Sequence, residues 1–281
     1  MSEKLAVLLS GGGMKCTWGA GVMLALAEKL GVKEPPIVIA GSGSSGTGAY
    51  FVSKQYEAIR NIWGNLIPQK GVIDPFRLGK MMDIDFLIDN ILKEKEPLKL
   101  EVLRSSPTHL LIPATNSRTG KLAYFSNKDN VDLYDAMRAT ITIPLAFNLN
   151  PHIPVNGSTY CDGPLSSNAE NHIEKAVELG AKKILLVTTA PQDEGLKGIS
   201  HSLFELWNLF KNPNHGSDYR IAAQKAVDYK PPKDVCVMSF VPESPLEINM
   251  LTRDSAALNR TIQKGYNEAC SRTELARFLR K

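Results

Sequence analysis

The chain has 281 residues, of which 43% are hydrophobic and 22% are charged, proportions typical of a globular protein with a large core. Its net charge of +4 comes from 33 basic and 29 acidic residues that are scattered along the chain, so no basic tract indicates a nucleic-acid partner. The four cysteines form no C-x-x-C pair, which argues against a disulfide scaffold or a zinc knuckle and favours a reducing, cytoplasmic setting.

Short apolar runs alternate with helical patterns along the chain. Strands are expected at 5–9, 37–40, 108–113, 121–125, 158–161, 183–188 and 235–240. Helices are expected at 18–30, 48–63, within 74–100, and at 133–138, 170–180 and 253–281, the last as one long helix or a pair. This alternation predicts an α/β fold with a mainly parallel central sheet flanked by helices. No linker composition interrupts the pattern, so residues 1–281 are expected to form a single domain.

The N-terminal segment does not resemble a targeting signal. Its apolar run, Leu5–Leu9, is too short for the core of a signal peptide and leads into glycines. No stretch of about 18 uncharged apolar residues occurs anywhere, so no membrane-spanning helix is expected.

Gly11, Gly12 and Gly13 directly follow the first predicted strand. In a parallel sheet they lie at the carboxyl edge, where ligands bind. Their amides are unobstructed by side chains, and such a loop can stabilise an oxyanion or hold a phosphate. A simple connecting turn is the other interpretation of this loop.

A second glycine-rich turn, Gly41–Gly46, carries Ser42, Ser44 and Ser45 at the start of a helix. A serine on such a sharp turn is exposed, and the helix dipole favours negative charge beside it. The turn also matches the dinucleotide pattern Gly-x-Gly-x-x-Gly. That pattern requires an acid at the end of the next strand, whereas residues 62–64 are typical of a helix. A dinucleotide-binding module therefore stays only as an alternative.

Asp162 and Gly163 end the predicted strand at 158–161. A carboxylate at a strand end can project into a cleft, although Asp-Gly turns are frequent. A catalytic triad of Ser44, Asp162 and either His201 or His215 is a less favoured alternative. Both histidines lie in polar or amphipathic stretches without a flanking turn. The histidines show no metal-ligand spacing, so no metal site is expected.

Four sequence blocks, taken in order, resemble the patatin-like phospholipase family. They are SGGGMKCTWGAGVMLAL, IVIAGSGSSGTGAY, LYDAMRATITIPLAF and YCDGPLSSN. They are similar to the family's oxyanion loop, its nucleophile elbow, a block ending in proline and phenylalanine, and its Asp-Gly block, and together they cover about residues 5–190. The resemblance implies a three-layer patatin-like architecture and a serine lipid acyl hydrolase without a cofactor, which cleaves carboxylic esters as a phospholipase A or lysophospholipase does.

The resemblance also implies roles for individual residues. Ser44 would be the nucleophile and Asp162 its base, in a dyad rather than a triad. The oxyanion hole would be formed by the amides of Gly11, Gly12 and Gly13. Supporting roles are expected for Lys15, Gly46 and Gly163.

The position of the nucleophile is chosen among three serines, because the family's Gly-x-Ser-x-Gly pattern has no strict copy here. Ser44 has Gly46 two residues ahead, whereas Ser45 has Gly43 two residues behind. Ser44 is preferred because it keeps a small residue and a glycine after it. Ser42 and Ser45 stay open as alternatives.

The expected substrate is a lipid ester, with a peripheral membrane contact left open. The apolar segment Leu203–Phe210 is interpreted either as a lid over the cleft or as a helix packed on the core. A lipid-binding protein without activity, on a related α/β fold, is the remaining alternative.

Overall fold

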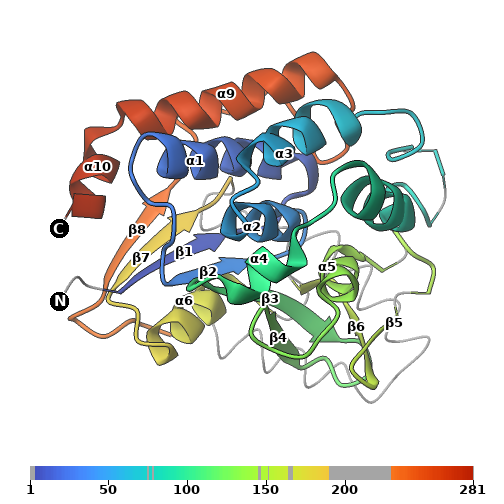
Figure 1. Ribbon diagram of the computed structural model, residues 1–281, viewed down its shortest axis with the longest axis horizontal. Coiled ribbons are helices and arrows are strands. Elements are labelled where there is room, and N and C mark those ends of the chain that lie inside the picture. The colour runs from blue at the N-terminus through green and yellow to red at the C-terminus, as the bar shows by residue number, and fades with distance from the viewer. Residues whose placement is uncertain are drawn as a thin grey trace.

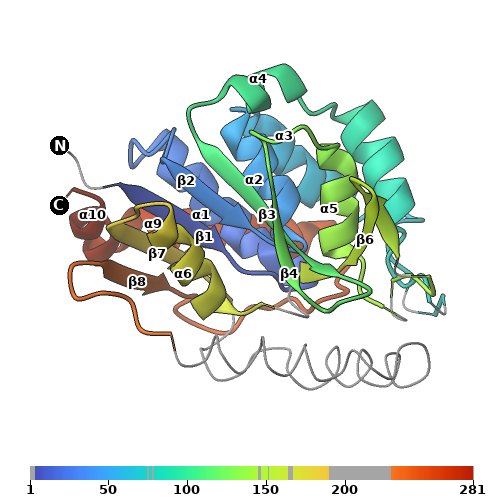
Figure 2. The same ribbon diagram turned by 90° about the horizontal axis from the view of Figure 1, so that it is seen from below.

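The structure is a computed structural model, and its central feature is a sheet covered by helices on both faces (Figures 1 and 2). It describes residues 4–74, 76–77, 79–144, 147–150, 152–163, 167–189 and 229–280. Within these ranges the sheet has eight strands in the order β5-β6-β3-β2-β1-β7-β8, and β4 pairs with β3. The predicted α/β class with a mostly parallel sheet is thereby confirmed.

The parallel part of the sheet consists of β1, β2, β3, β7 and β8, and β4, β5 and β6 pair antiparallel at one end. The strand bounds are β1 (Leu5–Leu9), β2 (Ile37–Ala40), β3 (His109–Asn116), β4 (Leu122–Ser126), β5 (Ile153–Val155), β6 (Ser158–Cys161), β7 (Lys183–Val187) and β8 (Cys236–Phe240). The hairpin partner β5 was not predicted. It has three residues, among them Pro154, too few for a readable alternation.

Helices pack on each face of the sheet. The α-helices are α1 (Cys16–Glu28), α2 (Ser44–Val52), α3 (Tyr56–Asn61), α4 (Leu100–Ser105), α5 (Leu133–Ile141), α6 (Ala169–Glu178), α9 (Ser255–Ser271) and α10 (Thr273–Arg280). Three further helical segments are the 3-10 helix η1 (Gly13–Lys15) and the π-helices η2 (Ile62–Leu66) and η3 (Phe86–Lys95). Successive side chains of β1 point to opposite faces of the sheet. Val7 and Leu9 belong to the large core with α1 and α2, whereas Ala6 and Leu8 pack on the side of α6. Among the described helices, none is long and apolar enough to cross a membrane.

The helix expected within 74–100 is shorter than the sequence suggests. Asp74 accepts the N–H of Phe76 through its side chain at 3.1 Å, and Gly79 has a φ of +66°. Both features favour a turn over a helix. An isolated bridge between Ile73 and Met82 closes this loop, and helical structure resumes only in η3 and α4.

Helix α9 lies directly against α1, and a glycine on each helix permits the close approach. A Cβ at Gly21 would be 2.0 Å from the carbonyl oxygen of Ile262, and a Cβ at Gly265 would be 2.1 Å from that of Trp18. The Trp18 indole N–H donates to Glu268 at 2.9 Å. This packing fixes α1 and, with it, the glycine loop that precedes the helix.

Strands β2 and β6 approach each other head-on along one edge of β3. Leu111 pairs with both β2 and β4, and Thr115 pairs with both β4 and β6, so β2 and β6 lie on the same edge, opposite β4. Strand β2 covers residues 109–111 and β6 covers 115–116. The carboxyl ends of the two strands therefore face each other across residues 112–114.

Pro113 occupies the middle of this gap. Because proline has no N–H, it leaves no unsatisfied donor on the edge of β3 that has no partner strand at residues 112–114. Its carbonyl accepts the hydroxyl of Thr140 at 2.5 Å. A Cβ at Gly41 would lie 3.0 Å from the Pro113 ring, and one at Gly163 only 2.4 Å from the Pro113 carbonyl oxygen. The residues that follow both strand ends thus lie against the same proline.

We expect Gly21→Ala to lower the free energy of unfolding by about 1–3 kcal/mol, because the added methyl overpacks the contact with α9. The higher helix propensity of alanine, worth ~1 kcal/mol, offsets only part of this loss. Urea unfolding measures the change. Gly46→Ala is the matched control, since a Cβ there meets nothing within 4 Å. Equal unfolding midpoints for the two variants would contradict the close helix approach.

Candidate active site

Ser42 lies on the sharp turn between β2 and α2, with a φ of +50°. Left-handed backbone is uncommon for a serine and indicates strain, which is typical of functional turns. The Ser42 N–H donates to the Thr140 hydroxyl at 3.0 Å, and this bond fixes the turn from the side of α5. The residue is 6% exposed and lines a pocket.

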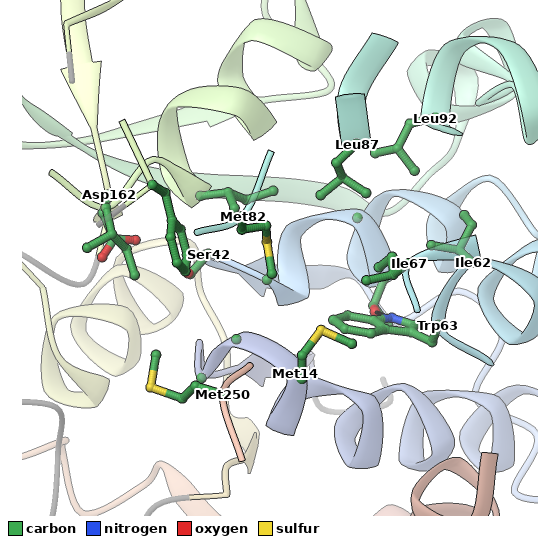
Figure 3. A pocket seen from close by; sticks show the side chains of 18 of the residues that line it. Met14, Ser42, Ile62, Trp63, Ile67, Met82, Leu87, Leu92, Asp162 and Met250 are labelled. Atoms are coloured by element: carbon green, nitrogen blue, oxygen red, sulfur yellow. Dashed lines mark hydrogen bonds between the residues drawn. The ribbon is translucent and has the colours of Figure 1, made fainter. Parts of the chain in front are cut away.

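Asp162 follows the last residue of β6 and lines the same pocket. Its backbone is held on both sides: its N–H donates to the Thr142 carbonyl at 3.0 Å, and its own carbonyl accepts the Thr115 hydroxyl at 2.7 Å. The Ser42 side chain is close enough to the carboxyl group to influence its pKa, and Figure 3 shows the two side chains together at one end of the pocket. The elbow and the carboxylate therefore meet, as the opposed strand ends require.

Burial controls the protonation of Asp162. Desolvation raises the pKa of its carboxyl from 3.8 to about 8, and the neighbouring Ser42 side chain acts in the opposite direction. The oxygen Oδ1 has no hydrogen-bond partner among the described residues. A carboxyl group with a pKa near neutrality can accept a proton in one step and return it in the next.

Ser44 and Ser45 are directed elsewhere. The Ser44 hydroxyl donates to the carbonyl oxygen of Ser10 at 2.8 Å. The Ser45 hydroxyl is buried without a hydrogen-bond partner among the described residues. Neither residue lines the pocket. The structure thus brings Ser42, and neither of the other two, against Asp162.

The glycine loop runs beside Ser42, because β1 and β2 are parallel neighbours that end at the same edge. Gly12 and Gly13 have φ values of +149° and +57° and line the pocket, whereas Gly11 does not. The N–H groups of Gly12, Gly13 and Gly43 have no hydrogen-bond partner in the described part of the chain. A Cβ at Gly13 would be 2.8 Å from the Met250 carbonyl oxygen, so a segment near the C-terminus supports the loop.

The residues expected to support the site differ in their surroundings. Lys15 is partly exposed, and no carboxylate of the described residues lies within ion-pair distance of it. Gly163 is required for packing, because a side chain would meet the backbone of Pro113. Gly46 lines the pocket, and a Cβ at its position would meet no atom within 4 Å.

Most of the pocket wall is apolar and was not identified from the sequence. The pocket contains about 830 Å³ of unfilled space, its open mouth included. Its apolar lining consists of Met14, Ile59, Ile62, Trp63, Ile67, Met82, Leu87, Leu92, Ile141, Ile143, Phe147 and Met250. Two walls carry a periodic signal: Gly43, Gly46, Thr47 and Tyr50 share one helix face along α2, and Ile59, Ile62 and Trp63 recur at helical spacing along α3 and η2. The remaining walls come from segments that only the tertiary fold brings together.

No histidine of the described residues lines the pocket. His172 is half-buried on α6, where its Nδ1 lies 2.9 Å from the Tyr124 hydroxyl, and desolvation lowers its pKa to about 4. His201, His215 and the segment Leu203–Phe210 lie outside the described residues. Within those residues, no group of three or more histidine, cysteine or acidic side chains is arranged to hold a metal ion.

The dinucleotide alternative also lacks its acidic residue. Residues 56–66 form α3 and η2, so no strand follows the serine turn closely. The next strand, β3, ends at Asn116, an amide where a ribose would require a carboxylate.

Comparison with known proteins identifies the family. The family model described as patatin-like phospholipase matches residues 7–170. A similar solved structure, the crystal structure of VipD from Legionella pneumophila, is 14% identical with a TM-score of 0.54, and the match covers 99% of this chain and 67% of that one. At this identity the likeness concerns the fold. No curated protein matches the chain. Membership of this family implies a serine hydrolase that acts on lipid acyl groups. Because the family match includes more than half of its residues, the chain belongs to the patatin-like phospholipase family.

Proposed function

We propose that this protein hydrolyses carboxylic esters of lipids through a dyad of Ser42 and Asp162. The observation that carries the proposal is the strained Ser42 turn paired with a buried carboxyl group at the one polar end of an apolar pocket. The proposal places the nucleophile at Ser42 instead of Ser44, the residue expected from the sequence. Family membership supports a phospholipid or lysophospholipid as the class of substrate.

In the proposed reaction, the Ser42 oxygen attacks the ester carbonyl carbon while its proton passes to Asp162. The tetrahedral intermediate collapses, the C–O bond to the alcohol breaks, and the alcohol leaves with the proton from Asp162. Water then attacks the acyl-enzyme, gives its proton to Asp162, and releases the fatty acid as the proton returns to Ser42. Asp162 thus alternates between base and acid, for which a pKa near neutrality suits it.

The negative charge of the tetrahedral intermediate requires donors, and three backbone N–H groups beside Ser42 supply them. Gly12, Gly13 and Gly43 line the pocket, and their N–H groups have no partner among the residues that the structure describes. Gly43 also stands at the N-terminus of α2, where the helix dipole favours an anion. Loss of one such donor typically costs about 2.7–4 kcal/mol of transition-state stabilisation. Gly11, also expected from the sequence, lies outside the pocket lining.

Ser44 is less suited to the role of nucleophile. Its hydroxyl is hydrogen-bonded to the Ser10 carbonyl, and it sits within the first turn of α2 instead of on the strained residue before the helix. We propose that Ser44 ties the serine turn to the glycine loop, so that the nucleophile and the oxyanion donors keep a fixed separation.

A fluorophosphonate probe distinguishes the two serines. Labelling of the wild-type protein is expected to give a single adduct on Ser42, mapped by peptide mass spectrometry. Ser42→Ala and Asp162→Asn are expected to abolish it. Ser44→Ala is expected to keep the adduct on Ser42 and to lose about 0.5–1.5 kcal/mol of stability with its buried hydrogen bond. An adduct on Ser44 would return the nucleophile to the position expected from the sequence, and no adduct would overturn the proposed enzyme.

The pH dependence follows from the raised pKa of Asp162. Because the ionised carboxylate is the active form, kcat/KM for a soluble ester, followed by pH-stat, is expected to rise with pH through about 8. The folded protein holds a proton that the unfolded chain releases, so this group makes stability fall as pH rises from 3.8 to about 8. Asp162→Asn should remove that fall. An activity midpoint in the usual carboxylate range would contradict the buried base.

Thr140 is expected to act as a positioning residue. Its hydroxyl accepts the Ser42 N–H and donates to the Pro113 carbonyl, so Thr140→Val leaves both groups unpaired. We expect kcat to fall by about 10–100-fold, as for a small displacement of a reacting group, with little change in KM. Thr140→Ser keeps the hydroxyl and is expected to restore kcat. A serine variant as slow as the valine variant would show that the threonine methyl, and not the hydrogen bonds, is required.

A further inference from the structure

We propose that the pocket receives the acyl chain of the ester and that Gly46 sets the longest chain it accepts. The inference rests on the proposed ester hydrolysis and adds a residue that determines specificity. It is carried by the shape and chemistry of the pocket wall along α2.

Helix α2 forms a straight wall that leads away from the nucleophile. Gly43, Gly46, Thr47 and Tyr50 all line the pocket, and spacings of three, four and seven residues place them on one helix face. At a rise of 1.5 Å per residue, the span from Gly43 to Tyr50 is about 10 Å. A chain bound by Ser42 would therefore lie along this face.

The polar atoms of that wall are already paired. The Thr47 hydroxyl accepts the indole N–H of Trp63 at 2.8 Å. The Tyr50 hydroxyl donates to the backbone carbonyls of Leu92, at 3.3 Å, and Glu96. These bonds leave mainly carbon atoms facing the pocket, and Asp162 is the one charged side chain in its described lining.

Figure 3 shows this separation along the pocket. Ser42 and Asp162 lie at one end, whereas Ile62, Ile67 and Leu92 lie at the other. The pocket thus matches a molecule with one polar group, at the reacting carbonyl, followed by a hydrocarbon chain. A polar head group would have no partner at the far end, where burial without hydrogen bonds is unfavourable.

Gly46 differs from Gly43, which precedes α2, and from Gly48, which lies within the helix. A Cβ at Gly43 would lie 3.1 Å from the Gly13 carbonyl oxygen, and one at Gly48 would lie 2.7 Å from the Ala40 Cβ. Those two positions require glycine for packing. A Cβ at Gly46 meets nothing within 4 Å, so packing does not require glycine, although glycine weakens a helix. The space that a side chain at position 46 would fill is open and belongs to the pocket, between Ser42 and Tyr50.

Chain-length selectivity of Gly46 variants provides the test. We would measure kcat/KM for p-nitrophenyl butyrate, octanoate and palmitate, which share one leaving group. Each methylene kept out of an apolar site lowers kcat/KM by about fourfold, so Gly46→Leu is expected to lower the octanoate-to-butyrate ratio by about tenfold or more. Gly46→Ala raises helix propensity about as much as Gly46→Leu does, but its side chain adds little volume. This variant is expected to keep the octanoate-to-butyrate ratio within about twofold of the wild-type value.

An unchanged ratio in Gly46→Leu, with cooperative unfolding preserved, would overturn the inference while leaving the ester hydrolysis intact. It would show that the pocket holds the alcohol portion of the substrate or none of it. A ratio lowered as much by Gly46→Ala as by Gly46→Leu would also overturn it, because chain length would then not follow the volume at this position.

A binding measurement separates this inference from the catalytic proposal. Ser42→Ala should bind the fluorescent fatty acid cis-parinaric acid, and adding Gly46→Leu should weaken that binding by about tenfold or more, by the same loss per methylene. This outcome supports the acyl pocket even if no ester is hydrolysed. Equal binding by the single and double variants would overturn the role of Gly46, whatever the activity of the wild-type protein.

Discussion

The site depends on two strand ends that share one edge of β3. Because β2 pairs with β3 only as far as Leu111 and β6 pairs with it only from Thr115, the residues that follow the two strands are forced together, although about 120 positions separate them in the sequence. Several local features follow from this constraint. Glycine stands at positions 41 and 163 because the gap is narrow, and Pro113 fills its centre because no partner strand is present to receive an N–H.

The same arrangement is unfavourable for stability, and its neighbours hold it in place. A strained serine and a buried carboxyl group with an unpaired oxygen both raise the free energy of the folded state. Rigid elements on each side oppose relaxation: α5 through Thr140 and Thr142, β3 through Thr115, and α1 beneath α9. Strain of this kind would suit the proposed dyad, in which the serine must face the pocket and the base must be poorly solvated.

Local patterns predicted the parts of the site that depend on local structure. The glycine loop and Asp162 each follow a readable apolar strand, and the structure places Gly12, Gly13 and Asp162 in one pocket. The choice of Ser44 relied on the glycine two residues ahead, but the side-chain direction depends on which residue takes the left-handed φ, which the sequence does not show. The apolar wall was missed because η2, η3 and the segment around Met250 meet only in the tertiary fold, and β5 was too short to recognise.

The support of the glycine loop from Met250 bears on when the site is formed. The Met14 N–H donates to the Met250 carbonyl at 3.2 Å, and Gly13 lies against the same group, yet this segment follows the matched region 7–170 by some 80 residues. Proteins emerge from the ribosome N-terminus first. A growing chain therefore holds both members of the proposed dyad long before it holds the backing of its glycine loop. The proposed oxyanion donors would become rigid only after residue 250 has been synthesised, so the two side chains of the dyad would be present before the loop beside them is held in place.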